Sequence, residues 1–196
     1  MYARNIADKT YTFGVSGLLY KSNVLMYDHQ TESLWSQIKS EAVTGPMIGT
    51  PLKRLPSSLT TWKKWQRRHP QTEVLSTRTG YRRNYSKDPY EDYYRQKRGI
   101  FSFFRPGPGE EEKALVAGIE IDGEAKGYPV ELLRSKGVVE DRIGKTGLTL
   151  VFDKGTDRLT VKADDGRKLE AIIVYWFVWK GIHPGTAIYR DPGSGG

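Results

Sequence analysis

The chain has 196 residues, a mass of 22.3 kDa and a formal net charge of +8, and 12% of its residues are aromatic. This length fits one domain or two small ones, and the aromatic content argues against a disordered chain. Cysteine is absent, which excludes disulfides, thiol nucleophiles and zinc sites built on cysteine.

The first half of the chain shows strand patterns separated by turns. Tyr11–Val15 and Val24–Asp28 are rich in β-forming residues, and a third strand is expected within Glu32–Ile38. Glycines and prolines between Gly45 and Pro51 mark further turns.

The second half follows Arg105–Glu112, a stretch rich in proline and glycine that we interpret as a linker. Residues 1–104 then form a first module, residues 113–190 a second module, and residues 191–196 a flexible tail. We expect an Asp-Gly hairpin turn at Ile121–Glu124 and a short helix at Pro129–Lys136. The expected strands are Ala114–Ile121, Leu148–Phe152, Arg158–Lys162 and Leu169–Val174. The sequence therefore predicts a mainly β protein with a few short helices.

The chain carries no pattern of a signal peptide or a membrane span. Its opening residues, MYARNIADKT, lack the apolar core of a signal peptide. The longest apolar run, Ala171–Trp179, has nine residues, whereas a membrane-spanning helix needs about 20.

One motif, Trp-x-x-Trp-x-x-x-His-Pro-x-Thr, occurs twice. Thr60–Leu75 matches Val174–Tyr189 without a gap, and five of 11 motif positions are identical, two of them the rare tryptophan. The paired residues are Trp62 with Trp176, Trp65 with Trp179, His69 with His183, Pro70 with Pro184, and Thr72 with Thr186. We interpret the match as an internal duplication.

The spacing of the motif is typical of a short helix. Both tryptophans and the histidine lie on one helical face, Thr60 or Thr61 can cap the first copy, and the proline ends the helix at about the histidine. We expect a tryptophan-anchored helix packed on a sheet, with a strand after it and the histidine at its end. Two histidines that converge on a metal are the alternative, but no carboxylate stands at ligand spacing in both copies, so no metal site is predicted.

The two copies differ in what precedes them. VFDKGTDRLTV, ahead of the second helix, resembles MYARNIADKTYTF at the N-terminus, and 38 residues before it, Lys113–Leu150, have no counterpart ahead of Met1. The first copy is therefore expected to lack its opening strands, because the chain is a fragment, because its start is placed too late, or because a partner chain supplies them. An exposed sheet edge should result, which favours a homo-oligomer or a partner chain that completes the first sheet.

The stretch MYDHQTES gathers polar side chains in one loop. The candidate ligand-binding residues are Asp28, His29, Thr31, Glu32 and Ser33. In one interpretation the loop binds a ligand or catalyses a reaction, with Asp28 orienting His29 or binding a cation. In the other, the loop is a turn whose Asp and Thr side chains bond the local backbone. Adjacent strand residues face opposite sides, so a catalytic triad that pairs Asp28 with His29 is not favoured.

Tyrosines alternate with arginines and lysines between Arg78 and Arg98. Such a segment can bind single-stranded nucleic acid, and the net charge fits anionic partners in general. Asp88, Glu91 and Asp92 dilute the positive charge, and tyrosines that cover a sheet explain the composition without a ligand, so nucleic acid is not favoured. No phosphate-binding loop, dinucleotide fingerprint or HExxH motif occurs, and no cofactor is predicted.

Over almost its whole length the chain resembles one family of bacteria and archaea, Domain of Unknown Function 3179. The resemblance rests on FGVSGLLYKSNVLMYDHQTESLWSQ, its continuation EAVTGPMIGTPLKRLP, the later GIEIDGEAKGYPVELL, and the two tryptophan motifs. The family has no established activity. The resemblance implies that members carry a Cys-Pro-x-Cys-like motif, at times with selenocysteine, shortly before the segment that matches MYARNIADKTYTFGVSG. An extracytoplasmic location of the chain is suggested by this resemblance alone.

Three functional hypotheses follow. The first is that the chain is the non-catalytic remainder of a thiol or selenol redox protein whose reactive motif lies upstream of Met1. The second is a module that binds a ligand or partner through the MYDHQTES loop and the Tyr/Arg-rich segment. A hydrolase or metal-dependent enzyme is the least favoured.

Overall fold

The computed structural model describes residues 1–91 and 113–192, and within these ranges the protein is mainly β with three short helices, as predicted. The elements of the first range are β1 (Asn5–Ile6), β2 (Lys9–Thr10), β3 (Phe13–Tyr20), β4 (Asn23–Asp28), β5 (Leu34–Ser36), β6 (Glu41–Thr44) and α1 (Trp62–Arg68). Those of the second are β7 (Leu115–Ile121), β8 (Glu124–Pro129), α3 (Val130–Lys136), β9 (Val138–Ile143), β10 (Thr146–Asp153), β11 (Arg158–Ala163), β12 (Lys168–Leu169), β13 (Ile172–Tyr175), α4 (Trp176–Ile182) and β14 (Ala187–Ile188). The predicted linker at 105–112 and the end of the tail at 193–196 lie outside the described residues.

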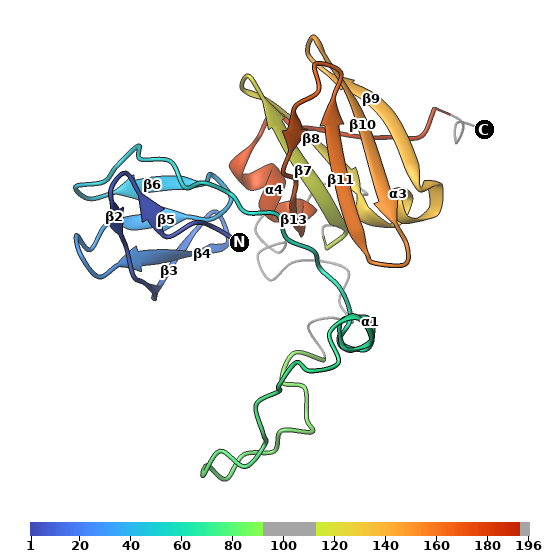
Figure 1. Cartoon of the computed structure of the whole chain (residues 1–196). Helices are drawn as coiled ribbons and strands as arrows, with labels where there is room; N and C mark the ends of the chain where they lie inside the picture. Colours follow the sequence, from blue (N-terminus) through green and yellow to red (C-terminus); the bar gives the residue numbers. More distant parts are fainter. Residues whose placement is uncertain (92–112, 193–196) are drawn as a thin grey trace.

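The antiparallel strands β3, β4, β5 and β6 form the N-terminal sheet (Figure 1). Trp35 on β5 is fully buried at its centre, and the rings of Tyr11 and Phe13 meet the indole edge-on, at 6.5 and 5.6 Å between centroids. The other buried residues of this core are Ile6, Ala42 and Leu52. One large aromatic residue therefore organises a small sheet.

The second range forms two sheets and two helices. The inner sheet has the order β13-β7-β8-β14, and the outer sheet has the order β12-β11-β10-β9. Side chains alternate along β7: Ala117 and Ile119 face the core shared with α3 and the outer sheet, whereas Val116 faces α4. The inner sheet thus has the outer sheet on one face and α4 on the other.

The helix α4 is seated on two glycines that face each other. The predicted Asp-Gly turn joins β7 to β8, with Asp122 and Gly123 both at positive φ, and this register pairs Gly118 with Gly127. A Cβ placed on Gly118 would lie 2.4 Å from the Trp179 ring, and one on Gly127 would lie 2.9 Å from the Trp176 ring. We call Gly118 and Gly127 the glycine seat, because the absence of side chains lets both indoles lie against the sheet.

Two of the expected strands are not found as predicted, and β6 and β9 are strands that the sequence analysis did not select. The strand expected at Leu169–Val174 is two strands, because the chain leaves the outer sheet after β12 and enters the inner sheet at β13. The strand expected after the second motif is present as β14, which pairs with β8 in parallel. The strand expected after the first motif, at residues 72–76, is absent, since this segment pairs with no strand among the described residues.

The strand β3 leaves one edge of the N-terminal sheet open in the described part of the chain. Val15, Leu18 and Leu19 on this strand are 73%, 54% and 61% exposed. The edge that the sequence predicts, left open by missing opening strands of a first copy, stays a prediction. Self-association or pairing with another chain through it stays a prediction.

The glycine seat predicts a large effect of a single methyl group. Gly118→Ala should lower the free energy of unfolding by about 1–3 kcal/mol or more, because the new Cβ collides with the Trp179 ring. Gly185→Ala is the matched control, since nothing lies within 4 Å of a Cβ at that glycine. Urea denaturation measures both values, and equal losses in the two variants would contradict this account of the seat.

Candidate functional site

The MYDHQTES loop is a turn built around one buried carboxylate. Asp28 has no exposed surface. Its carboxylate accepts hydrogen bonds from the backbone N–H of Gln30 and from the backbone N–H and hydroxyl of Thr31. It also accepts one from Trp35 Nε1 at 2.8 Å, which ties the turn to the core of the N-terminal sheet.

These hydrogen bonds set the charge state of Asp28. Burial alone raises the pKa of this carboxyl, but the donors on Trp35, Thr31 and Gln30 outweigh it, so the pKa lies below the ordinary value. The carboxylate therefore stays ionised at neutral pH while its oxygens are occupied by protein donors.

The other candidate residues of the loop divide between inside and outside. Ser33 is fully buried, and its hydroxyl contacts that of Thr31 at 2.7 Å and accepts the backbone N–H of Met47. His29 and Glu32 are exposed, and the His29 ring lies 4.8 Å from that of Tyr27. Asp28 and His29 thus face opposite sides and form no catalytic pair, and ligand binding by the exposed pair stays a prediction.

The two tryptophan motifs have the same local geometry. In each copy the histidine is the C-cap of the helix, and its ring lies 4.1 Å from that of the second tryptophan, Trp65 or Trp179. Each of these tryptophans donates from Nε1 to the threonine of its motif, at 3.0 Å to Thr72 and 2.9 Å to Thr186. Thr61 caps the first copy through its hydroxyl.

The surroundings of the two motifs differ completely. On α4, Trp176 and Trp179 are 4% and 0% exposed because they lie on the glycine seat. On α1, Trp62 and Trp65 are 47% and 40% exposed, and the helix has no buried residue. The same helical face is therefore covered in one copy and uncovered in the other.

The helix α4 also joins the N-terminal sheet to the inner sheet. Ile38 packs in one cluster with Val116, Trp176 and Trp179. Next to this cluster, the half-buried His183 lies 4.0 Å from the Glu120 carboxylate. Its Nε2 atom is buried without a hydrogen-bond partner among the described residues.

The pKa of His183 lies below its ordinary value, mainly because the side chain is buried. The negative charge of Glu120 raises this pKa, whereas the positive charges of Arg54 and Lys39 lower it further. Its counterpart in the first motif, His69, is exposed. Neither histidine belongs to a group of three or more potential metal ligands among the described residues.

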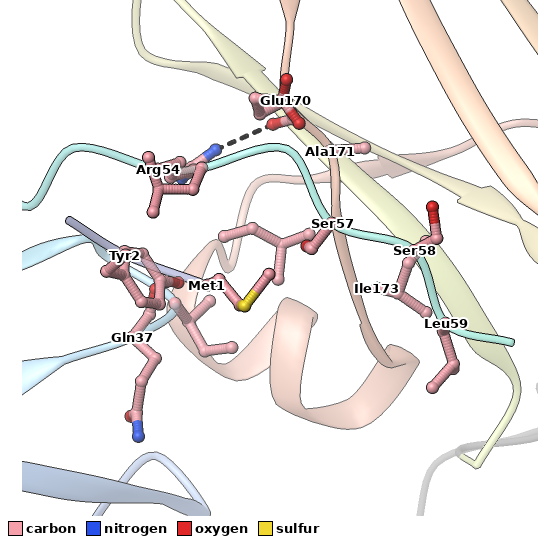
Figure 2. A pocket seen from close by; sticks show the side chains of 13 residues that line it. Met1, Tyr2, Gln37, Arg54, Ser57, Ser58, Leu59, Glu170, Ala171 and Ile173 are labelled. Carbon is pink, nitrogen blue, oxygen red and sulfur yellow. Dashed lines mark hydrogen bonds between the residues drawn. The ribbon is translucent and has the colours of Figure 1, made fainter. Parts of the chain in front are cut away.

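A cavity of about 340 Å³ lies between the N-terminal sheet and the inner sheet. Figure 2 shows Ser57, Ser58 and Leu59 on one ribbon, Ala171 and Ile173 on the ribbon beside it, and Met1 near Tyr2. At one end, the Arg54 guanidinium donates to Ser40 Oγ at 2.7 Å and to the carbonyl of Glu170 at 3.1 Å.

Sequence reasoning did not select the glycine seat, Arg54 or this cavity. The seat had a signal, because Gly118 and Gly127 lie at equal distances from the Asp-Gly turn. The cavity had no signal in the sequence, because its walls come from segments that are far apart in the sequence.

The described part of the Tyr/Arg-rich segment, residues 78–91, is exposed. Tyr81 and Tyr90 are 74% and 61% exposed, so these tyrosines do not cover a sheet. Residues 92–98 of this segment lie outside the described residues. Among the helices that the structure describes, none has the length and apolar character needed to cross a bilayer.

Comparison with protein families matches residues 1–174 to the family described as a protein of unknown function, DUF3179. The chain belongs to this family. No curated protein and no solved structure matches it. Membership in DUF3179 agrees with the resemblance noted in the sequence, and it carries no activity with it.

The Asp28 turn predicts a loss of stability with a defined pH dependence. Asp28→Asn should lower the free energy of unfolding by about 2–3 kcal/mol at pH 7, because an amide cannot accept all four hydrogen bonds. The lowered pKa means that the carboxylate stabilises the fold above the unfolded-state pKa of about 3.9, and that this contribution is lost as the pH falls through the folded-state pKa. Urea denaturation should therefore show a smaller difference between the two proteins at pH 3 than at pH 7. An equal difference at both pH values would contradict the assignment.

The two motifs predict opposite outcomes for equivalent substitutions. Trp176→Ala should cost about 3–5 kcal/mol of unfolding free energy, because a buried indole is lost. Trp62→Ala should cost less than about 1 kcal/mol, because this indole is already 47% exposed. Thermal and urea unfolding measure both values, and similar losses would show that α1 is covered.

Proposed function

We propose that the chain is a non-catalytic scaffold that binds a β-sheet segment of a partner polypeptide through the Trp62 and Trp65 face of α1. One observation carries the proposal: this face has the local geometry of the α4 face but is uncovered. A half-exposed pair of indoles is costly to leave in water and is typical of a binding surface.

The chemistry of the partner follows from the second copy. On α4 the same two tryptophan positions require a pair of strands in which two glycines face each other. Side chains at those positions would hold the indoles away from the sheet. A partner for α1 is therefore an antiparallel pair of strands with a glycine at each of two opposed positions.

The helix α1 is held in place for such a partner. The carboxylate of Asp157, in the turn between β10 and β11, accepts hydrogen bonds from Lys64 Nζ at 2.7 Å and from the Thr60 hydroxyl at 3.2 Å. The hydrogen bond from Lys64 is the main reason why the pKa of Asp157 lies below its ordinary value. The contact fixes the first turn of α1, and Figure 1 shows α1 next to the outer sheet and apart from the N-terminal sheet.

The family resemblance adds a proposal about chemistry. This chain contains no cysteine, so a thiol or selenol that takes part in redox chemistry has to come from the partner polypeptide. The polypeptide encoded immediately upstream in the same reading frame is the first partner to test. Co-expression should yield a complex with thiol–disulfide exchange activity, and a complex without exchange would overturn the redox proposal while leaving the scaffold proposal intact.

A cyclic peptide tests the scaffold proposal directly. The probe has the sequence Leu115–Pro129, closed at its open end by a D-Pro-Gly turn, so that it presents the glycine seat in isolation. Adding it to the chain should shift tryptophan emission to shorter wavelength as Trp62 and Trp65 become covered. Trp62→Ala and Trp65→Ala should each weaken binding by about 30-fold, which is the typical loss at a central aromatic contact.

The matched control is the same peptide with valine in place of both glycines of the seat, which should not bind. Equal binding of the two peptides, or binding that survives the loss of both tryptophans, would contradict the proposal. A cyclic peptide that fails to form the paired strands, as seen by NMR, is replaced by the same seat in a longer hairpin.

A further inference from the structure

We propose that the cavity between the N-terminal sheet and the inner sheet binds a free α-amino acid with an apolar side chain. This inference concerns a different surface from the Trp62 and Trp65 face and does not rest on the proposed function.

The cavity has the size and the walls of a site for a small molecule. Its volume of about 340 Å³ lies at the lower end of the range for ligand pockets, which is about 300–1,000 Å³. Apolar side chains form much of the wall, among them Ile38, Leu55 and Ile173. Leu59 also lines the cavity and is 63% exposed, so the cavity is open to solvent on that side and a small molecule can enter.

The lining residues include one cationic and one anionic side chain, Arg54 and Glu170. Neither forms an ion pair with a described residue, and the two are not paired with each other. Figure 2 shows both residues at the same end of the cavity, where the Arg54 guanidinium donates to the carbonyl of Glu170 and not to its carboxylate. One ligand that carries both charges can therefore satisfy both residues.

The Arg54 guanidinium is held in place before any ligand binds. On either side of this residue, the N–H groups of Ala3 and Leu55 donate to the carbonyls of Lys53 and Met1, each at 2.9 Å. The side chain makes two hydrogen bonds to neutral acceptors, which leaves three of its five N–H groups without a partner in the described part of the chain. A side chain fixed in this way loses little conformational freedom when it binds a carboxylate.

A free amino acid matches the cavity group by group. Its carboxylate suits the planar guanidinium of Arg54, and its ammonium group suits the carboxylate of Glu170. An apolar side chain such as that of leucine suits the wall formed by Ile38, Leu55 and Ile173. A carboxylic acid without the ammonium group would leave Glu170 unpaired, and an amine without the carboxylate would leave Arg54 unpaired.

The test compares L-leucine with two analogues that each lack one charged group. Isothermal titration calorimetry with the full chain should show saturable binding of L-leucine with a Kd of about 1 mM or lower, as expected for a ligand of this size. Isocaproate lacks the ammonium group, and isoamylamine lacks the carboxylate. Each should bind at least about tenfold more weakly, because it loses hydrogen bonds to a charged side chain.

Two substitutions assign the charges. Arg54→Gln should weaken the binding of L-leucine at least about tenfold, whereas Lys53→Gln, which removes an exposed charge next to the cavity, should bind as the parent chain does. Glu170→Gln should weaken L-leucine by a similar factor and should not weaken isocaproate, which has no ammonium group. Far-UV circular dichroism checks the folds, and Glu170→Gln together with the analogues decides the matter if Arg54→Gln does not fold.

Three results would each overturn the proposal. The first is the lack of saturable L-leucine binding at concentrations up to about 10 mM. The second is binding of isocaproate as tight as that of L-leucine, and the third is an unchanged affinity for L-leucine in Glu170→Gln.

Discussion

Two indole rings that lie on two opposed glycines attach the helix α4 to the inner sheet. Gly118 and Gly127 face each other across β7 and β8, and their lack of side chains brings Trp179 and Trp176 against the backbone of the sheet. The contact attaches α4, and α4 in turn packs on Ile38 of the N-terminal part. Glycine is needed here for space and not for an unusual backbone conformation, since a Cβ at Gly118 would overlap the ring of Trp179.

The helix α1 carries the same motif as α4 but has no glycine seat beneath its tryptophans in the described part of the chain. Its histidine C-cap, its Trp–His contact and its Trp–Thr hydrogen bond repeat those of α4, so the local fold of the motif forms without a sheet. The sheet adds the burial of the two indoles, and this burial stabilises the fold more than the local contacts of the motif do. In the MYDHQTES loop, Asp28 uses its hydrogen-bonding capacity in the turn and on Trp35, whereas His29 and Glu32 are exposed.

Local features of the fold could be predicted from the sequence. The Asp-Gly hairpin, the helix Val130–Lys136 and the ends of both tryptophan helices at the histidines depend on neighbouring residues alone. Long-range features could not be predicted. The division of Leu169–Val174 between two sheets depends on which strands lie beside it, and the cavity depends on how Ser57–Leu59 runs past β13. The glycine seat falls between these cases, because the turn sets its register but only the position of α4 gives it a role.

The central claim is that one motif exists in two environments, and the exposure of the five tryptophans measures it most directly. The chain labelled with 5-fluorotryptophan gives one fluorine signal for each of Trp35, Trp62, Trp65, Trp176 and Trp179, assigned by substitution. In the isolated chain the account predicts that a soluble paramagnetic agent broadens the signals of Trp62 and Trp65 and leaves the other three sharp. Equal protection of all four motif tryptophans, or equal broadening of all four, would contradict it.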